Sequence, residues 1–483
     1  MPHFAIEAVR SWCIATETGL HDYEFARHDH AIAVRTENLL LLAAYLASRG
    51  LCSDTRLELE ALIDGLCGLL EDDAFYSRHT NHGIEQSRIL ATVAYVLDGH
   101  QASARRWDIA MARLADELAF AFTREGVNVE NSPGYHDYVC NAFLKIVRAF
   151  PSDRMEPLRR RIDALMPKAM RFLAHIVRPD GKLPVIGDTQ LRGVHSRFDA
   201  YADRPEAAWL EYATSNGRRG QPPEETMACF PESGYLVVRD RWRKVVDTGK
   251  DVHLVMKCGC RSRYHRHDDD LNIVLFFGED WLVDGGAYCY EEASPVRRYL
   301  RSKWAHNVPV IQHPGRGWRA LSTRSYGAAL QVDVADDGSL AARARTGAYA
   351  GYRASRLLEV SRGRRSFIVH DRLDPIAPRG ESLFRSLWHF PDDKEIYRRN
   401  QDILVLSTKS GRALRIRNVG ERFGSVGEFF PEIAGHAGAV MSQRANQLAR
   451  VRVVSLNRRA SSFESRLRFD ILDKAETGGW RLL

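Results

Sequence analysis

The chain has 483 residues, with 69 Lys and Arg against 62 Asp and Glu, so its formal net charge is +7. This length exceeds one ordinary domain and predicts two, each able to bury a substantial core. Eight cysteines in so long a chain exclude a small disulfide scaffold. The arginines are dispersed and no recognised binding module is present, which argues against a nucleic-acid-binding protein.

The N-terminal part predicts helices. Apolar residues recur at three- and four-residue spacing in the segments 31–48, 56–70, 87–97, 104–122 and 155–176. Short polar turns join these segments. Paired helices of similar length predict an incomplete α/α toroid.

A run rich in Gly, Pro and Arg at 215–223 has no apolar period and predicts a boundary. Short β-rich runs bounded by turns follow it, at 234–239, 253–256, 272–277, 366–370 and 403–407. We therefore predict a multidomain α+β protein in which an incomplete α/α toroid precedes an antiparallel β-sandwich. The expected limits are 1–215 for the toroid, 216–226 for a linker and 227–483 for the sandwich.

A first polar group opens the helix that continues through Leu90 and Val96. Asn81 is the expected N-cap. His82 and Glu85 are three residues apart and share a helix face, beside the positive end of the helix dipole, which favours a neutral imidazole and an anion. Capping alone would also account for Asn81 and Glu85.

A second group lies at 130–138, where Ser132 begins a Ser-Pro-Gly turn. The turn brings two tyrosines, a histidine and two carboxylates to the start of the next helix. A structural protein rarely needs so dense a set, so this group favours a chemical role.

The third group is Tyr-His-Arg-His at 264–267, followed by Asp284 and by Ala-His-Asn at 305–307. His267 precedes an apolar stretch, Asp284 ends it and His306 follows a connection, so three strand ends can meet at one rim. Imidazole nitrogen and carboxylate oxygen are zinc ligands, and three of them leave one position for water. The alternative is ordinary polar residues at strand ends, because no compact HExxH signature is present.

In this order and spacing the three groups resemble the heparinase II/III-like polysaccharide lyases, which include the oligoalginate lyases. The matching motifs are Asn-His with Glu three residues on, Glu-x-Ser-x-x-Tyr, His-x-His-x-Asp, Asp-x-Gly-x-x-x-Tyr and Ala-His-Asn. They fall on Asn81, His82, Glu85, Glu130, Ser132, Tyr135, His265, His267, Asp269, Asp284, Gly286, Tyr290, Ala305, His306 and Asn307.

The resemblance implies β-elimination at a uronic acid residue, which leaves a 4,5-unsaturated uronate end. The C5 proton is acidic because it lies beside a carboxylate, so that carboxylate must be neutralised or hydrogen-bonded. By resemblance Asn81 and His82 do this, Tyr135 moves the proton at C5, at O4 or at both, and His82 is the base for the opposite C5 epimer. His265 and Tyr290 bracket the substrate from the other domain. To act as a base at neutral pH the Tyr135 phenol would need a pKa roughly 2 to 3 units below its usual value of about 10, which nearby cations could supply.

Further residues in or beside the motifs are expected to contact the substrate, namely Glu85, Arg88, Glu130, Tyr138 and Asn307. The family's metal is mainly structural, so the resemblance implies a structural Zn²⁺ held by His267, Asp284 and His306, and no organic cofactor. Arginines near the third group either meet substrate carboxylates or form surface salt bridges; they are Arg297, Arg298 and Arg301.

This chain departs from the family pattern after Asp284, where Gly-Gly-Ala replaces the frequent Pro or Thr, and both Tyr288 and Tyr290 are available. Tyr290 is therefore the less certain match. We expect Asp268 to be a surface residue.

Two alternatives remain open. Glu85 and Glu130 are candidates for the acid and base of a glycoside hydrolase. A non-catalytic glycan-binding protein of a bacterial exopolysaccharide system would keep the fold without turnover. For the lyase we favour a bacterial acidic polysaccharide as the substrate; the sequence does not fix the uronic acid, the linkage, endo or exo action, or the oligomeric state.

The N-terminus has no basic region followed by an apolar one, so no secretory signal is expected, and no stretch is expected to span a membrane. Family members commonly work in the periplasm. For a complete chain without a signal we expect the cytoplasm.

Overall fold

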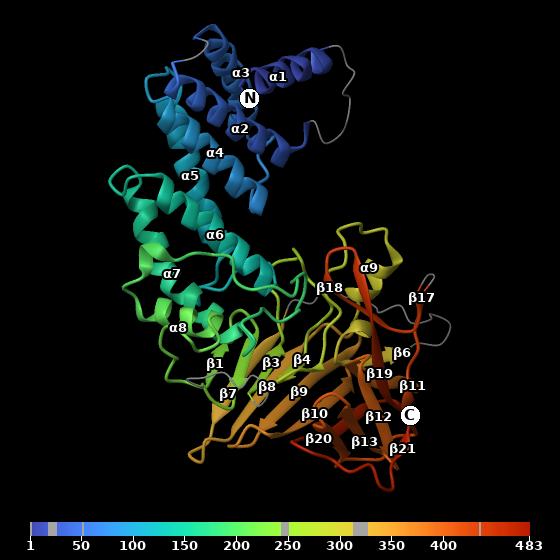
Figure 1. Cartoon of the computed structure of the whole chain (residues 1–483). Helices are drawn as coiled ribbons and strands as arrows, with labels where there is room; N and C mark the ends of the chain where they lie inside the picture. The colour runs from blue at the N-terminus through green and yellow to red at the C-terminus, as the bar shows by residue number, and fades with distance from the viewer. Residues whose placement is uncertain (1, 18–26, 51–52, 243–250, 313–326, 434–435) are drawn as a thin grey trace. The chain divides into compact units, whose positions relative to one another are not determined.

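The structure is a computed structural model that describes residues 2–17, 27–50, 53–242, 251–312, 327–433 and 436–483. Helices make up the N-terminal part and antiparallel sheets the C-terminal part (Figure 1), which confirms the expected multidomain α+β class. The chain divides into two compact units. Unit 1 comprises Met1–Phe122 and Asn141–Ala164, and unit 2 comprises Thr123–Cys140 and Leu165–Leu483. The domain limits drawn from the sequence stay a prediction.

The helices of the N-terminal part include each segment with helical spacing. They are α1 (Pro2–Glu17), α2 (Asp29–Ser48), α3 (Ser53–Glu71), α4 (Asn81–Val96), α5 (Ser103–Ala121), α6 (Pro133–Ala149), α7 (Glu156–Ile176) and α8 (Pro205–Thr214). In unit 1, α2 packs against α3 and α4, and α4 packs against α5.

By length and composition, α2 is apolar enough to cross a membrane, which differs from the expectation that no stretch would be. A helix in a protein core passes the same test, and one such helix is weak evidence of a span. The face of α2 that includes Ile32, Leu39 and Leu46 is buried within the protein, which is typical of a core helix.

The strands of unit 2 form three larger sheets and a small one. The first has the order β1-β2-β3-β4-β5 and consists of β1 (Met227–Phe230), β2 (Tyr235–Arg239), β3 (Val252–Lys257), β4 (Asn272–Phe277) and β5 (Asp280–Leu282). The second has the order β21-β12-β13-β14-β20-β10-β9-β8-β7 and consists of β7 (Ala329–Val334), β8 (Leu340–Thr346), β9 (Tyr352–Val360), β10 (Ser366–Pro375), β12 (Lys394–Arg399), β13 (Asp402–Ser407), β14 (Ala413–Asn418), β20 (Phe463–Leu472) and β21 (Arg481–Leu482).

The third sheet has the order β15-β19-β11-β6, with a further strand, β18, paired to β19. Its strands are β6 (Pro309–Gln312), β11 (Ser382–Pro391), β15 (Ser425–Glu428), β18 (Val440–Arg444) and β19 (Gln447–Ala460). The short pair is β16 (Glu432–Ile433) with β17 (His436–Ala437). Two short helical segments precede β6: α9 (Pro295–Leu300) and η3 (Lys303–Ala305).

Burial along the strands shows which sheets are covered on both faces. Residues of β8 and β9 alternate between buried and more exposed positions, which is the pattern of a sheet with one face on the core. All residues of β3 and β4 are buried. The first sheet is therefore an inner layer, and one of its contacts is the ring of Phe172 in α7, 5.1 Å from Phe230 and 5.2 Å from Tyr235.

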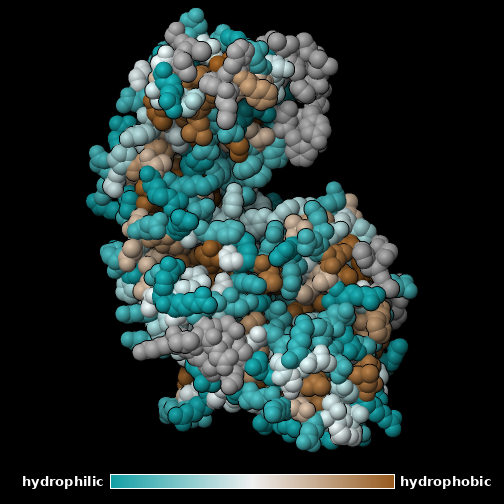
Figure 2. All heavy atoms as spheres, viewed as in Figure 1, coloured by the Kyte–Doolittle hydropathy of each residue, from teal (hydrophilic) through white to brown (hydrophobic). Residues whose placement is uncertain are grey.

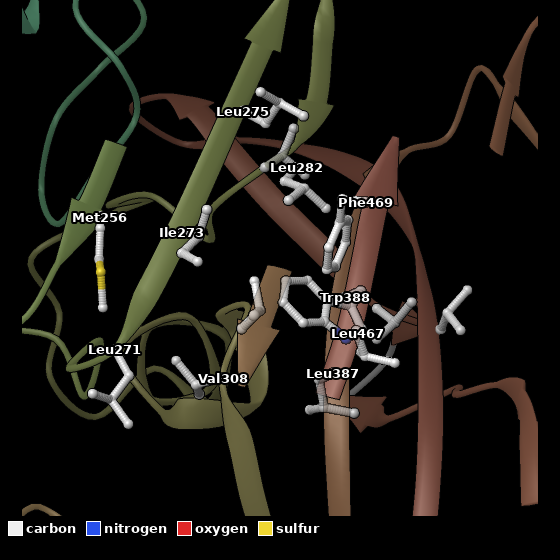
Figure 3. Packing of buried hydrophobic residues seen from close by; sticks show 14 of the residues in the cluster. Met256, Leu271, Ile273, Leu275, Leu282, Val308, Leu387, Trp388, Leu467 and Phe469 are labelled. Atoms are coloured by element: carbon white, nitrogen blue, oxygen red, sulfur yellow. The ribbon is translucent and has the colours of Figure 1, made fainter. Parts of the chain in front are cut away.

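The core joins all the larger sheets of unit 2 (Figure 3). Trp388 of β11 packs on Phe469 of β20 with 4.7 Å between ring centroids, and Ile273 and Leu275 of β4 belong to the same buried cluster. Each fully buried side chain of this kind contributes about 1.5–3 kcal/mol. The loops that carry the candidate site residues therefore leave from a closely packed framework.

The face of the molecule in Figure 2 is mainly hydrophilic, and its hydrophobic residues lie in small groups.

Candidate functional site

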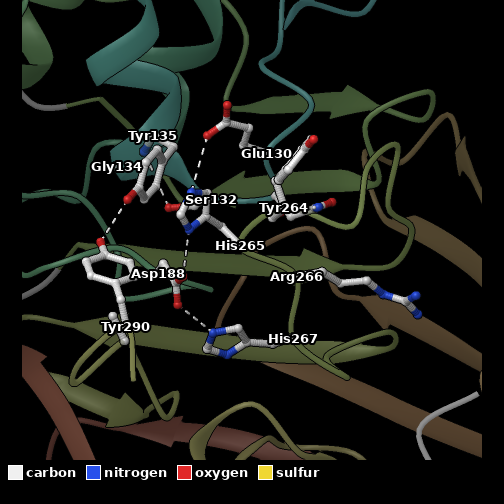
Figure 4. A network of polar contacts seen from close by, with 12 residues as sticks. Glu130, Ser132, Gly134, Tyr135, Asp188, Tyr264, His265, Arg266, His267 and Tyr290 are labelled. Carbon is white, nitrogen blue, oxygen red and sulfur yellow. Dashed lines mark hydrogen bonds and ion pairs between the residues drawn. The ribbon is translucent and has the colours of Figure 1, made fainter. Parts of the chain in front are cut away.

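In unit 2 the candidate site is formed by the first turn of α6, the loop after α7 and the loop between β3 and β4 (Figure 4). Ser132 Oγ accepts a hydrogen bond from the backbone N–H of Tyr135 at 3.4 Å. Thr189 Oγ1 accepts one from Gly134 N–H at 3.0 Å. These bonds satisfy N–H groups that a helix start leaves without intrahelical partners, and they fix Tyr135 against the loop that contains Thr189.

The imidazole of His265 stacks on the ring of Tyr135, with centroids 3.5 Å apart and planes 17° from parallel. His265 has φ +50° and Asn131 has φ +59°. For residues with a side chain this left-handed region costs about 1 kcal/mol or more. Asn131 Nδ2 holds the loop by donating to the carbonyls of Ser262 at 2.9 Å and Tyr264 at 3.0 Å.

A carboxylate that the sequence reading missed lies at the centre of this site. Asp188 accepts hydrogen bonds from His265 Nδ1 at 2.8 Å, from His267 Nε2 at 2.9 Å and from Arg297 Nη2 at 2.8 Å, and its side chain is 0% exposed. Burial by itself would raise the pKa of Asp188, but these donors hold it well below its usual range. Asp188 is therefore ionised.

The chain passes close to Asn131 just before Asp188. Gly187 has φ +56°, and a Cβ there would lie 2.7 Å from the Asn131 carbonyl oxygen. Glycine is required at this position.

Tyr135 donates a hydrogen bond from its hydroxyl to that of Tyr290 at 2.8 Å. Burial raises the pKa of Tyr135, and Tyr290, Asp188 and Glu130 raise it further. The described groups of unit 2 therefore raise this pKa, and the lowering by nearby cations that a base would need is not found among them. Tyr135 is a neutral phenol, suited to giving a proton rather than taking one.

Glu130 is 5% exposed, and its Oε2 lies 3.5 Å from His265 Nε2. Burial raises the pKa of Glu130 to about 7, although His265 opposes the shift. A carboxyl group of this pKa exchanges protons near neutral pH.

The other polar residues of 130–138 divide between surface and core. Tyr138 is 38% exposed, with its ring 6.3 Å from that of Tyr135. His136 is buried, accepts the Asn128 N–H and has its pKa lowered to about 4 by burial. Asp137 is buried and binds Arg192. His136 and Asp137 thus have structural roles.

The three predicted metal ligands come together. His267, Asp284 and His306 are buried, and one ligand atom from each lies within 4.8 Å of the others. His267 Nδ1 and His306 Nε2 are buried without a hydrogen-bond partner, and His306 Nδ1 lies 3.0 Å from Asp284 Oδ1. Two imidazoles and a carboxylate in so small a space fit a zinc ion, whose bonds to such atoms are about 2 Å long.

Two predictions beside this set need correction. Asp268 is not a surface residue: it is 8% exposed and lies 3.8 Å from Lys303 Nζ. Asn307 is 0% exposed, and its Nδ2 donates to the carbonyls of Ile273 and Val283. Asn307 is thus held in the core beneath His306 and presents no surface to a substrate.

In unit 1 the candidate residues lie at the start of α4. The N-cap is Thr80 rather than Asn81, because Thr80 has extended backbone and its Oγ1 accepts the Gly83 N–H at 3.1 Å. Asn81 begins the helix and is half-buried, and its side chain makes no hydrogen bond to another described residue.

His82 is held by a carboxylate that the sequence reading also missed. Its Nδ1 lies 3.2 Å from both oxygens of Asp29. Burial by itself would raise the pKa of Asp29. The pKa is lowered by hydrogen bonds from Ser77 and from the His30 N–H, and by His82. An ionised carboxylate accepts a hydrogen bond from Nδ1–H, so Nε2 is the ring nitrogen of His82 that Asp29 does not contact.

Glu85 and Arg88 bind other protein groups. Glu85 accepts hydrogen bonds from Arg88 Nε at 2.7 Å and from Lys145 Nζ at 3.3 Å. Arg88 also donates two hydrogen bonds to Glu37, at 2.9 and 3.0 Å. Both residues are less than 8% exposed. Burial by itself would raise the pKa of Glu85, but Arg88 and Lys145 lower it. These contacts correct the expectation that the two residues touch substrate.

Two family models match the chain. The heparinase II/III-like C-terminal model covers residues 222–470, and the heparinase II/III N-terminus model covers residues 69–209. The chain belongs to the heparinase II/III-like family. The matched regions contain every residue predicted here for the site.

Individual relatives are distant. A heparin-sulfate lyase of Bacteroides stercoris is 24% identical over 257 residues, which is 49% of this chain and 36% of that protein. One from Bacteroides thetaiotaomicron is 22% identical over 264 residues, 49% of this chain and 37% of that protein. These matches thus span little more than a third of the relatives' length.

Solved structures share the fold. A heparinase III structure has a TM-score of 0.75 at 13% identity, with 92% of this chain and 70% of that chain covered. The heparan sulfate lyase HepC from Pedobacter heparinus has a TM-score of 0.72 at 15% identity, with 98% and 72% covered.

Proposed function

We propose that this protein is a polysaccharide lyase that cleaves a uronate-containing acidic polysaccharide by β-elimination and leaves a 4,5-unsaturated uronate end. The observation that carries the proposal is the neutral Tyr135 phenol, stacked on His265 and hydrogen-bonded to Tyr290. Relatives named heparin-sulfate lyases support the reaction class, and among acidic polysaccharides they favour a glycosaminoglycan. A bacterial exopolysaccharide is the other substrate we propose to test.

The reaction needs a base at C5 and an acid at O4. In the proposed cycle His82 Nε2 takes the C5 proton, the C5–H electrons form the C4=C5 double bond, and the C4–O4 bond breaks. The Tyr135 hydroxyl then protonates O4. A phenol is protonated at neutral pH and can therefore donate, and the hydrogen bond from the Tyr135 hydroxyl to Tyr290 at 2.8 Å supports the acid role.

Charge builds up on the substrate carboxylate as the C5 proton leaves. We assign the Asn81 amide as a donor to that carboxylate, because a fixed donor at the developing charge lowers the barrier. Asp29 stabilises the imidazolium that forms when His82 takes the proton, and its 3.2 Å contacts to Nδ1 support this role. Tyr290 accepts from Tyr135 until O4 replaces it as the acceptor.

We also propose a structural zinc ion at His267, Asp284 and His306. When bound, it would cross-link the loops that carry these residues. The unpartnered His267 Nδ1 supports the assignment, and so does the Asp188 carboxylate on His267 Nε2, since ligand histidines usually donate their second N–H to such a group.

A glycoside hydrolase is the second candidate, since burial raises the pKa of Glu130 to about 7 and a general acid needs a raised pKa. The proposed partner of Glu130, Glu85, is tied to Arg88 and Lys145. These ion pairs weaken the hydrolase hypothesis.

Ultraviolet absorbance during incubation with heparan sulfate, alginate and bacterial uronate exopolysaccharides tests the proposal. Growth of an alkene chromophore that Tyr135→Phe and His82→Ala both abolish supports the lyase. New reducing ends without the chromophore would establish a hydrolase. Binding without any cleavage would favour a glycan-binding protein.

A further inference from the structure

Asp188 contacts one residue from each of the two functional sets of unit 2. It binds His265, which stacks on Tyr135, and His267, one of the three proposed metal ligands. We propose that Asp188 is a positioning residue that couples metal binding to the orientation of His265. The inference rests on the metal site and the β-elimination proposed above.

The coupling follows from the hydrogen-bonding capacity of a carboxylate. An ionised carboxylate only accepts hydrogen bonds, so His265 must present N–H at Nδ1 and His267 must present it at Nε2. His267 then keeps its lone pair on Nδ1, the buried atom that has no other partner. His265 Nε2, the nitrogen that Asp188 does not contact, faces Glu130 Oε2 at 3.5 Å. One carboxylate therefore sets the tautomers of both histidines.

Arg297 fixes the carboxylate itself. Its two terminal nitrogens bind the two oxygens of Asp188, and Nη1 also donates to the Ala287 carbonyl at 2.9 Å. Ala287 lies between the metal ligand Asp284 and Tyr290 in the sequence. The same arginine thus joins Asp188 to the segment that carries both residues, and its planar two-point contact is stiffer than a single ion pair.

An amide cannot replace this carboxylate. Asparagine has one accepting oxygen and one donating NH₂. If the NH₂ faces His267, the proton of His267 moves to Nδ1 and blocks metal ligation. If it faces His265, the proton of His265 moves to Nε2. In either orientation the NH₂ also opposes an Arg297 N–H group. Asparagine has nearly the same size and shape as aspartate, so Asp188→Asn changes the hydrogen-bonding pattern without leaving a cavity.

The test compares Asp188→Asn with Asp280→Asn in the full chain. Asp280 is a matched control, because it accepts a hydrogen bond from Arg178 Nη1 at 2.7 Å in the same unit and touches neither histidine. Zinc affinity is measured by competition with a chelator, and bound zinc by elemental mass spectrometry. We expect Asp188→Asn to weaken zinc binding about 10- to 100-fold and Asp280→Asn to leave it unchanged.

Activity at saturating zinc tests the second half of the coupling. With the metal fully bound, kcat of Asp188→Asn on the uronate substrate should stay at least about tenfold below that of the unaltered protein, while KM changes less than about threefold. Full recovery of kcat would overturn the coupling, since Asp188 would then serve the metal alone. Unchanged zinc affinity would overturn it as well.

A second variant covers the case in which Asp188→Asn fails to fold, as judged by circular dichroism. Arg297→Lys keeps the charge but loses the two-point contact, so we expect a smaller loss of zinc affinity, about threefold to tenfold. Unchanged zinc affinity in this variant would overturn the inference. If the unaltered protein cleaves no uronate polysaccharide, the proposed function fails, while zinc affinity still decides the role of Asp188.

Discussion

In unit 2 Asp188 and the three proposed metal ligands are buried, whereas in unit 1 His82 is about one-third exposed and is held by one carboxylate. Asp188 binds three side chains at once, and its side chain is fully buried. Asp29 is itself partly exposed. A site whose charges are fixed before the substrate arrives needs little reorganisation during the reaction. In the proposed lyase, Tyr135 of unit 2 is therefore expected to be the more rigidly held group and His82 of unit 1 the more adaptable one.

The largest effect should come from the proposed acid. Tyr135→Phe should lower kcat about 10³-fold, because it removes the proton donor to O4. Stability should change by only about 1 kcal/mol, the usual net value of one hydrogen bond. Alkene absorbance and urea unfolding measure the two quantities, with Tyr397→Phe as the control, because it also loses one hydrogen bond, to Glu395 at 2.6 Å. Retention of activity in Tyr135→Phe would show that Tyr135 is not the acid.

Removing the metal should loosen unit 2. A ligand at a thousand times its Kd stabilises the folded state by about 4 kcal/mol, so a strong chelator should lower the Tm by several degrees and added zinc should restore it. His306→Ala should have the lower Tm without chelator and should not respond to it. His370→Ala, at a part-exposed histidine paired with Glu464 at 2.7 Å, should respond like the unaltered protein. A chelator response in His306→Ala would contradict the assigned ligand.

The pH dependence of the free energy of unfolding tests one buried carboxyl group in each unit. Burial raises the pKa of Glu130 in unit 2 and that of Glu117 in unit 1 to about 7 each. Each group binds its proton more tightly when folded, so its contribution is present at low pH and is lost as pH rises from about 4.5 to about 7, with an upper limit of about 3 kcal/mol. Urea unfolding from pH 5 to 8 should show a shallower decline in stability for Glu130→Gln and for Glu117→Gln than for the unaltered protein. If stability falls with pH equally in all three proteins, the raised pKa values of Glu130 and Glu117 are contradicted.

The smallest effect should fall on the proposed base. Asp29→Asn removes the ionised acceptor at His82 Nδ1, so we expect kcat to fall about tenfold to a hundredfold with little change in KM. Asp116→Asn is the matched control, because Asp116 also binds a histidine of unit 1, His79 Nε2 at 3.1 Å. Equal losses in the two variants would show that Asp29 has no special role.

The sequence predicted the fold class and the residues that carry motifs. Helical spacing and strand composition were sufficient for the class, and the motif order located Tyr135, His265 and the three metal ligands. The sequence did not show Asp188 or Asp29, because each carboxylate reaches its histidine across more than 50 residues through tertiary packing. A single aspartate has no local signal for such a contact.

The predictions for Asn81, Asn307 and Asp268 were wrong for a related reason, because the sequence does not show how each side chain is oriented. Asn81 has a good capping side chain, but Thr80 precedes it with the extended backbone that an N-cap requires. Asn307 belongs to the Ala-His-Asn motif and was read as functional, and Asp268 lies inside the His-x-His-x-Asp motif and was read as exposed. The side chain of Asn307 instead supports the backbone beneath His306, and Asp268 is buried near Lys303. Proximity in sequence does not tell which side of a loop a residue faces.

The left-handed backbone at Asn131 and His265 has a consequence for engineering. Glycine tolerates such φ values at no steric cost, so a selection for heat resistance alone would favour His265→Gly wherever relief of strain outweighs the lost stacking on Tyr135. Thermal selection and turnover would then pull the same position in opposite directions. A stabilised form of this protein should therefore be sought with positions 131 and 265 held constant.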